Sequence, residues 1–255
     1  MPPFSKKRTY KKRKGGTRKA RGSTKPHVSF AVKKYVKSKI HNQIENKMIT
    51  TYASNNSVTG PQFILPLAPL VSQGQGSSGR IGNKINLLSA NLSFVLNLNP
   101  YNLTTNPYAS PVMFRWMLIT QRNSNSGVLS LSNFFEVNNS SVSIQGNHLD
   151  LLLKVNPELF QVHKQGQFRL GASSNSTTFP ASSAVAMEAS KFSIQKRIYI
   201  HKYLHKRICY DDTVVTPTNT NLWFLLFPVY ANGSTNSAYV NANISYVFTH
   251  TYEDA

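Results

Sequence analysis

Cysteine and long apolar runs are nearly absent from this chain of 255 residues. Its single cysteine, Cys209, excludes an intrachain disulfide, which is more typical of an intracellular chain than of a disulfide-stapled secreted one. The most apolar run, Leu222 to Ala231, is far shorter than the roughly 18 residues that a membrane-spanning helix needs. We therefore expect no membrane insertion and interpret this run as a buried strand.

Acidic residues are also scarce, with 9 Asp and Glu against 29 Lys and Arg, for a net charge of +20. No paired-carboxylate pattern, nucleophile elbow or His-Glu-x-x-His motif occurs, so we predict that the chain is not an enzyme and needs no cofactor. His201, His205 and Cys209 are spaced to share one face of a helix. Their segment has the pattern of a strand running into a loop, so we predict no metal site.

The positive charge is concentrated at the N-terminus. Residues 1–47 carry 16 basic residues and one acidic residue. The first 25 residues carry eleven basic residues and no acidic residue. Such a segment lacks the apolar side chains that a core requires, so we predict a disordered arm over residues 1–27. It can neutralise phosphates without a fixed shape, which predicts a polyanionic partner. The predicted nucleic-acid contacts of the arm are Lys6, Lys7, Arg8, Lys11, Lys12, Arg13, Lys14, Arg18, Lys19, Arg21 and Lys25. The cluster Lys6, Lys7, Arg8, Lys11, Lys12, Arg13 and Lys14 is also typical of a nuclear-import signal.

Residues 28–48 form a basic linker with one helical period. Apolar side chains recur every fourth residue from Val28 to Met48, and lysines occupy other faces. This pattern predicts a helix that forms against nucleic acid or a neighbouring subunit, and the alternative is a continuation of the arm. Lys33, Lys34 and Lys37 are further candidate nucleic-acid contacts.

From residue 49 to 255 the helical period is replaced by short runs rich in β-branched and aromatic residues, separated by Asn, Ser, Gly and Pro clusters. The predicted strands are Ile49–Ala53, Gln62–Leu67, Asn83–Asn97, Val112–Arg122, Phe160–Leu170, Lys191–Leu204, Asn221–Tyr230 and Ala238–Tyr252. Eight alternating strands with long polar loops predict an all-β fold, an antiparallel jelly-roll sandwich. The loops Ser124–Ser132, Asn138–Asn147 and Ala172–Ser183 are long enough to suggest functional or intersubunit roles. Trp116 and Trp223 are expected in the core.

A glycine-rich loop precedes the strand predicted at Asn83. Gly74 to Gly79 permit tight turns, and Arg80 and Lys84 flank the entry to the strand. A structural or intersubunit role for Gly79, Arg80, Gly82 and Lys84, a nucleic-acid contact and a plain solvated loop all remain open. Arg80 and Lys84 could bind phosphate, or they could fix the loop by pairing with a carboxylate.

A second basic region runs from Lys191 to Cys209. Lys196, Arg197 and Lys202 alternate with Tyr199 and Tyr203, which the strand pattern places on one face together with His201. Basic residues interleaved with aromatic rings can hold single-stranded nucleic acid. The alternative is a solvated strand whose lysines protect a sheet edge.

The basic arm and the motif Arg80-Ile-Gly-Asn-Lys-Ile85 after its glycine-rich loop resemble the capsid proteins of circovirus-like, circular single-stranded DNA viruses. The element Phe160–Leu170 also resembles a strand–turn–strand of those proteins. The resemblance implies a small icosahedral T=1 shell of about 60 copies, a packaged single-stranded DNA genome, and location in the virion and the host nucleus. Host import receptors and an unidentified cell-surface receptor would be further partners. At about 60 copies, the net charge of +15 on residues 1–47 would supply roughly 900 positive charges to the genome.

The rival interpretation is a cellular nucleic-acid-binding β domain with a basic tail, associated with ribosomes or chromatin. Residues 48–255 are only mildly basic, and they show no RNA-recognition aromatic signature, zinc knuckle or KH loop. The choice of DNA over RNA depends on the resemblance alone.

Overall fold

The computed structural model describes residues 29–43, 46–100, 106–107, 110–122, 129–138, 140–171, 192–236 and 238–254, without the side chains of residues 37–43. The chain divides into two compact units, Met1–Gln43 and Ile44–Ala255, and each is described by itself. The predicted arm over residues 1–27 and the expected loop Ala172–Ser183 lie outside the described residues.

The described part of the first unit is a helix, α1 (Phe30–Gln43). Ser29 caps its first turn, because its hydroxyl accepts a hydrogen bond from the backbone N–H of Val32 at 3.3 Å. The helix lies inside the segment 28–48, where the four-residue period predicts one, and it ends before the first strand begins.

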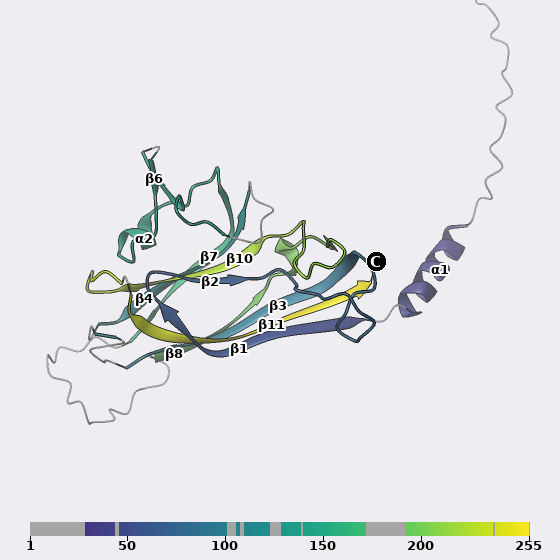
Figure 1. Cartoon of the computed structure of the whole chain (residues 1–255), viewed down its shortest axis with the longest axis horizontal. Coiled ribbons are helices and arrows are strands. Elements are labelled where there is room, and N and C mark those ends of the chain that lie inside the picture. Colours follow the sequence, from purple (N-terminus) through teal and green to yellow (C-terminus); the bar gives the residue numbers. More distant parts are fainter. Residues whose placement is uncertain are drawn as a thin grey trace, which may run out of the picture. The chain divides into compact units, whose positions relative to one another are not determined.

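Two antiparallel sheets form the second unit, and Figure 1 shows them as stacked layers. Sheet A has the order β1 (Lys47–Thr59), β11 (Val240–Asp254), β3 (Lys84–Leu98) and β8 (Ser193–Tyr199), and the short β9 (Arg207–Cys209) also pairs with β3. Sheet B has the order β2 (Phe63–Pro66), β10 (Leu222–Tyr230), β4 (Val112–Gln121) and β7 (Phe160–Leu170). Every pairing in the two sheets is antiparallel.

The strand order is that of a jelly roll. Without β9, sheets A and B contain eight strands. When these eight are numbered 1 to 8 along the chain, sheet A has the order 1-8-3-6 and sheet B has the order 2-7-4-5. This interleaving of early and late strands is the double Greek key of a jelly roll. The all-β, eight-stranded antiparallel sandwich predicted from the sequence is therefore confirmed, and the eight predicted strands correspond to these eight.

The main core lies between the two sheets. Along β3 the side chains of Ala90, Leu92, Phe94, Leu96 and Leu98 are buried, while the intervening residues are partly exposed. This period of two is the one the sequence predicted for a strand with one buried face. Trp116 also belongs to this core, as expected.

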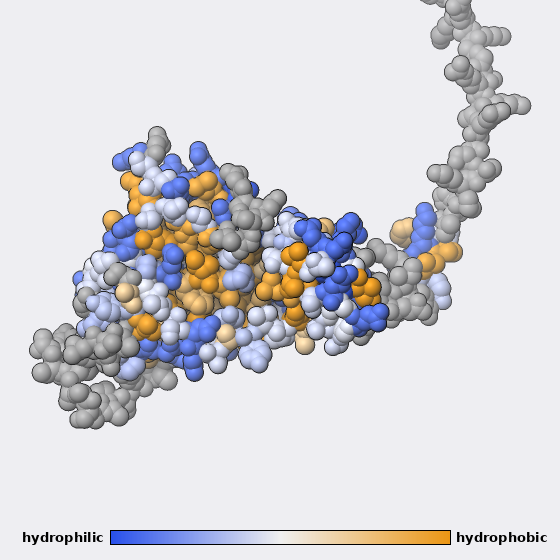
Figure 2. All heavy atoms as spheres, viewed as in Figure 1, coloured by the Kyte–Doolittle hydropathy of each residue, from blue (hydrophilic) through white to orange (hydrophobic). Residues whose placement is uncertain are grey.

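A second apolar cluster covers the outer face of sheet B. The connection between β4 and β7, described over residues 129–138 and 140–159 and here called the insertion, includes β5 (Phe135–Val137), β6 (Ser140–Val142) and the short helix α2 (Leu149–Leu152). Its apolar side chains pack on odd-numbered residues of β10, whereas the even-numbered ones face sheet A. Members of this second cluster are Met117, Ile119, Leu131, Phe134, Phe135, Val155, Phe160, Trp223, Leu225 and Phe227. All nine residues of β10 are consequently buried, and Figure 2 shows apolar residues gathered where the insertion meets the sandwich.

A buried polar pair attaches the insertion to sheet B. The Arg115 guanidinium donates hydrogen bonds to the carbonyls of Asp150 and Leu153, at 2.8 and 3.0 Å. The Asp150 carboxylate accepts hydrogen bonds from the backbone N–H groups of Gln145 and Gly146. Burial raises the pKa of Asp150, and these backbone donors oppose that rise.

The structure corrects the extent of one predicted strand and shows where two of the long loops lie. The strand predicted over Lys191–Leu204 ends at Tyr199, and a 3-10 turn, η1 (His201–Tyr203), follows it. The described parts of the loops Ser124–Ser132 and Asn138–Asn147 belong to the insertion. Leu131 packs in the second cluster, so this part of the first loop contributes to the core.

Candidate nucleic-acid interface

Arg80 lies inside the glycine-rich loop, with 0% of its surface exposed. Its guanidinium donates to the carbonyls of Val71 (3.3 Å), Gly82 (2.7 Å), Asp211 (2.9 Å) and Val214 (3.1 Å), and to the Asn83 side-chain oxygen (3.1 Å). These five bonds match the five N–H donors of a guanidinium. Arg80 therefore has no donor left for phosphate, and backbone carbonyls rather than a carboxylate hold it.

The same loop is held by two neighbouring strands of sheet A, β1 and β11. The Lys47 ammonium, on β1, donates to the Gly79 carbonyl at 2.9 Å and lies 2.6 Å from the Asp254 carboxylate. The Tyr252 hydroxyl donates to the Ser78 carbonyl at 2.8 Å, and burial followed by the nearby Asp254 charge raises its pKa to about 12. The loop thus contacts both the first and the last strand of the β domain along the chain.

The four predicted loop residues differ in environment. Gly79 is buried, and a Cβ there would lie 2.6 Å from the Gly74 carbonyl oxygen, so the tight turn requires glycine. Gly82 contributes a carbonyl acceptor to Arg80. Lys84 is exposed at the start of β3 and remains open to a partner.

The second basic region does not form one continuous face, so the expected grouping of Tyr199, His201 and Tyr203 is wrong. Arg197 and Tyr199 lie on β8, with the guanidinium 5.3 Å from the centre of the Tyr199 ring. Tyr203 lies on η1, where its ring is 5.2 Å from that of His163 on β7 and 4.9 Å from the Lys202 ammonium.

The two groups differ in what they can contact. Tyr203 packs against the main core, whereas Tyr199 is 57% exposed. Lys196 follows Gln195 on β8 and is partly buried. Of the predicted contacts in this region, Arg197 and Tyr199 therefore lie together on one sheet face. There the Tyr199 ring can stack on a base and the Arg197 guanidinium can contact a phosphate.

The basic residues of the first unit are described only in part. Lys33 and Lys34 are exposed on α1, and Lys37 lies on the same helix, with its side chain outside the described residues. The arm contacts from Lys6 to Lys25, including the predicted import signal, fall outside the described residues. Their role remains a prediction.

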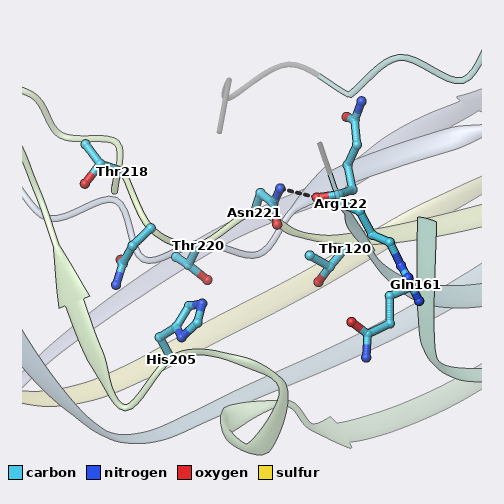
Figure 3. A pocket seen from close by; sticks show the side chains of 9 residues that line it. Thr120, Arg122, Gln161, His205, Thr218, Thr220 and Asn221 are labelled. Carbon is cyan, nitrogen blue, oxygen red and sulfur yellow. Dashed lines mark hydrogen bonds between the residues drawn. The ribbon is translucent and has the colours of Figure 1, made fainter. Parts of the chain in front are cut away.

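A polar pocket of about 470 Å³ opens beside the start of β10 (Figure 3). The described residues that line it are Thr120, Gln121, Arg122, Gln161, His205, Thr218, Asn219, Thr220 and Asn221. Several of its amides and hydroxyls already bind backbone: Asn221 donates to the Gln121 carbonyl at 2.7 Å, and Asn219 donates to the Arg207 carbonyl at 2.9 Å. Arg122 and His205, on opposite sides in Figure 3, are its titratable groups. The pocket can attract an anion but pairs no nucleophile with a base.

The His201, His205 and Cys209 spacing does not produce a shared face. His201 begins η1, His205 lies in the following turn, and Cys209 ends β9. Among the residues that the structure describes, no three His, Cys, Asp or Glu side chains lie close enough to hold a metal ion. The described helices are also too short or too polar to cross a bilayer.

Sequence reasoning missed Tyr52, which is 77% exposed on β1. Through the register of sheet A, Tyr52 pairs with Val247, Val247 with Ser93, and Ser93 with Arg197. A tyrosine from the N-terminal strand therefore lies on the same outer face as Arg197 and Tyr199, which are almost 150 residues later in the chain. The residues around Tyr52 in β1 do not alternate regularly between apolar and polar, so the local sequence does not show which face Tyr52 occupies. The pairing of β1 with β11 places Tyr52 on the outer face of sheet A.

Comparison with known proteins gives only distant structural likenesses. No family model matches the chain, and no curated protein matches it. A structure of Desmodium yellow mottle tymovirus superposes with a TM-score of 0.36 and 9% identity, covering 98% of this chain and 96% of that one. The dimeric latent PorU of Porphyromonas gingivalis gives a TM-score of 0.25 and 11% identity, covering 83% of this chain and 13% of that one. The function proposed below rests on this chain's own residues.

Proposed function

We propose that this chain is a viral coat protein that assembles into a closed shell and packages single-stranded DNA through its basic arm. The observation that carries the proposal is the combination of a jelly roll with a polycation attached to its first strand. Jelly rolls build capsids but also other proteins, and the sequence resemblance to circovirus-like capsids favours the first use. The arm adds a partner chemistry that a shell protein needs, because a packaged genome must be neutralised.

Exposed apolar side chains at the two ends of the β domain support contacts between copies. At one end, α2 exposes Leu149 and Leu152, by 54% and 79%. At the other, Ile81, Val214 and Val215 are 64%, 45% and 41% exposed, on the loops at the end where Figure 1 marks the C-terminus. Two different surfaces that contact each other in successive copies produce a ring when the rotation closes, which is how a shell vertex forms.

The arm accounts for packaging without sequence recognition. Residues 1–47 carry a net charge of +15, whereas the remaining residues carry +5. Contacts to phosphate position a protein on nucleic acid and carry no sequence information directly. Binding should therefore weaken steeply with salt and be similar for unrelated sequences. The same arm would serve as the nuclear-import signal before assembly.

The test compares the full chain with a truncation that begins at residue 26. Both proteins are purified after nuclease treatment, and the protected nucleic acid is measured from the 260/280 nm absorbance ratio of the particle peak. We expect the truncated chain to keep its β fold by circular dichroism and to lose most of the protected nucleic acid. A truncated chain that packages as much nucleic acid as the full chain at physiological salt would contradict the role of the arm.

A further inference from the structure

The two sheets of the sandwich differ in what their outer faces contact. The insertion covers the outer face of sheet B, so β10 is buried on both sides. On sheet A the outward side chains of Tyr52, Tyr199 and Val247 are 77%, 57% and 45% exposed. Figure 1 shows this sheet as the layer farthest from the insertion. Sheet A is therefore the side of the sandwich on which a broad sheet surface is open to a partner.

Two neighbouring rows of side chains cross this surface. One row runs from Tyr52 through Val247 and Ser93 to Arg197, and the next ends at Tyr199. The middle of the first row is Val247 and Ser93, and the middle of the second row is polar throughout. These side chains are smaller than a tyrosine ring, so Tyr52 and Tyr199 project above them at opposite edges of the sheet. Three strand spacings separate Tyr52 from Arg197, or about 14 Å. The residues of the second row are Thr50, Thr249, Asn91 and Tyr199.

The charge on this face complements a polyanion. Strand alternation places Arg197, Arg207 and Lys84 outward, because their neighbours Ile198, Ile208 and Ile85 are buried in the core. The acid that alternation places on the described part of this face is Glu253, which is only 6% exposed. The Arg197 guanidinium also lies 5.3 Å from the Tyr199 ring centre, so a cation and a stacking surface occur together.

The chain runs from its basic N-terminal segment directly into a strand of the same sheet. β1, which carries Tyr52, begins four residues after α1 ends at Gln43. Nucleic acid bound by the basic N-terminal segment is therefore linked through the chain to this sheet, and the link raises the effective concentration of the nucleic acid there. A second protein copy is a weaker fit, because the exposed apolar side chains Met48, Leu88 and Val247 are separated by polar residues and form no continuous apolar patch.

We propose that the outer face of sheet A is a second nucleic-acid site, where bases of a single strand stack on Tyr52 and Tyr199 and a phosphate contacts Arg197. Stacking on aromatic rings tolerates any base, so the site adds affinity without sequence preference. The inference rests on the proposed packaging function and assigns part of the binding to the folded domain rather than to the arm.

The experiment measures binding of fluorescent oligo(dT) of about 20 nucleotides to the full chain over a series of salt concentrations. The variants are Tyr52→Ser with Tyr199→Ser, the ring-preserving pair Tyr52→Phe with Tyr199→Phe, Arg197→Gln, and the control Ser141→Ala, whose exposed side chain lies on β6 of the insertion. Intrinsic tryptophan fluorescence checks that each variant remains folded.

The serine pair should bind at least about 10-fold more weakly at every salt concentration, with an unchanged salt slope, because it loses stacking and no phosphate contact. Arg197→Gln should reduce the slope of log K against log salt by about 0.7, the value for one phosphate contact to a single strand. The phenylalanine pair and Ser141→Ala should bind like the wild type.

Wild-type binding by the serine pair would overturn the inference while leaving the packaging function intact. A full chain that binds no oligo(dT) would instead refute the packaging function itself. If the serine pair bound oligo(dT) normally but formed no particles, the face would be a contact between protein copies, which also overturns the inference.

Discussion

Replacing Arg80 by lysine tests whether the glycine-rich loop is a structural element or a nucleic-acid contact. Lysine keeps the positive charge but has three donors on one nitrogen instead of a planar fork of five. It cannot reach the Val71, Asp211 and Gly82 carbonyls together, because these acceptors surround the guanidinium on different sides. At about 1–3 kcal/mol for each buried acceptor left without a partner, and with water able to reach some of them, we expect a loss of about 3 kcal/mol.

The assay is thermal unfolding of the full chain, followed by the fluorescence of the buried Trp116 and Trp223. In a domain of this size, about 3 kcal/mol corresponds to a decrease in Tm of roughly 6–12 °C. The control is Lys84→Met, which removes an exposed charge from the same segment and should change stability by no more than about 0.5 kcal/mol. If Arg80→Lys unfolded like the wild type but lost nucleic acid, the structural account of this loop would be refuted.

Two further substitutions test the packing. Gly166→Ala should destabilise the chain by about 1–3 kcal/mol in urea unfolding, because its Cβ would lie 2.7 Å from Trp116 Nε1. The control Gly76→Ala should be nearly neutral, because a Cβ at Gly76 would meet open space. Equal effects of the two substitutions would contradict this packing. Burial lowers the pKa of His250 to about 3 from 6.5. Since the unfolded chain takes up this proton below pH 6.5 and the folded chain does not, stability should fall from pH 6.5 toward 3 by up to about 1.4 kcal/mol per pH unit. His250→Leu should remove that part of the slope, and an unchanged slope would show that other groups cause it.

Local pattern was sufficient to predict the strands of the sandwich, because they are runs of β-branched and aromatic residues bounded by turn residues. The alternation along β3 identified both the strand and its buried face, and the uniform apolar character of β10 identified a buried strand. The same uniformity predicts a cover on the second face, since an apolar strand needs neighbours on both sides. The insertion, with Phe134 and Phe135, provides that cover, although parts of its sequence have only the Ser- and Asn-rich pattern of long loops.

The candidate site was less predictable, because its geometry depends on contacts between distant segments. The local sequence does not show that Arg80 is buried, because two of its acceptors are the carbonyls of Asp211 and Val214, more than 100 residues later in the chain. A strand that continued past Ile200 would place Tyr203 on the face of Tyr199, yet the chain leaves the sheet at Ile200, where a 3-10 turn begins. Tyr52 joined the site only through the pairing of β1 with β11. Such long-range pairings leave no period in the local sequence.

The most direct test of the central claim is negative-stain electron microscopy of the purified, nuclease-treated full chain, with the 260/280 nm absorbance ratio of the same chromatographic peak. The account predicts uniform closed shells that retain protected nucleic acid. A small monodisperse species that loses its nucleic acid under these conditions would contradict the account and favour a cellular nucleic-acid-binding β domain.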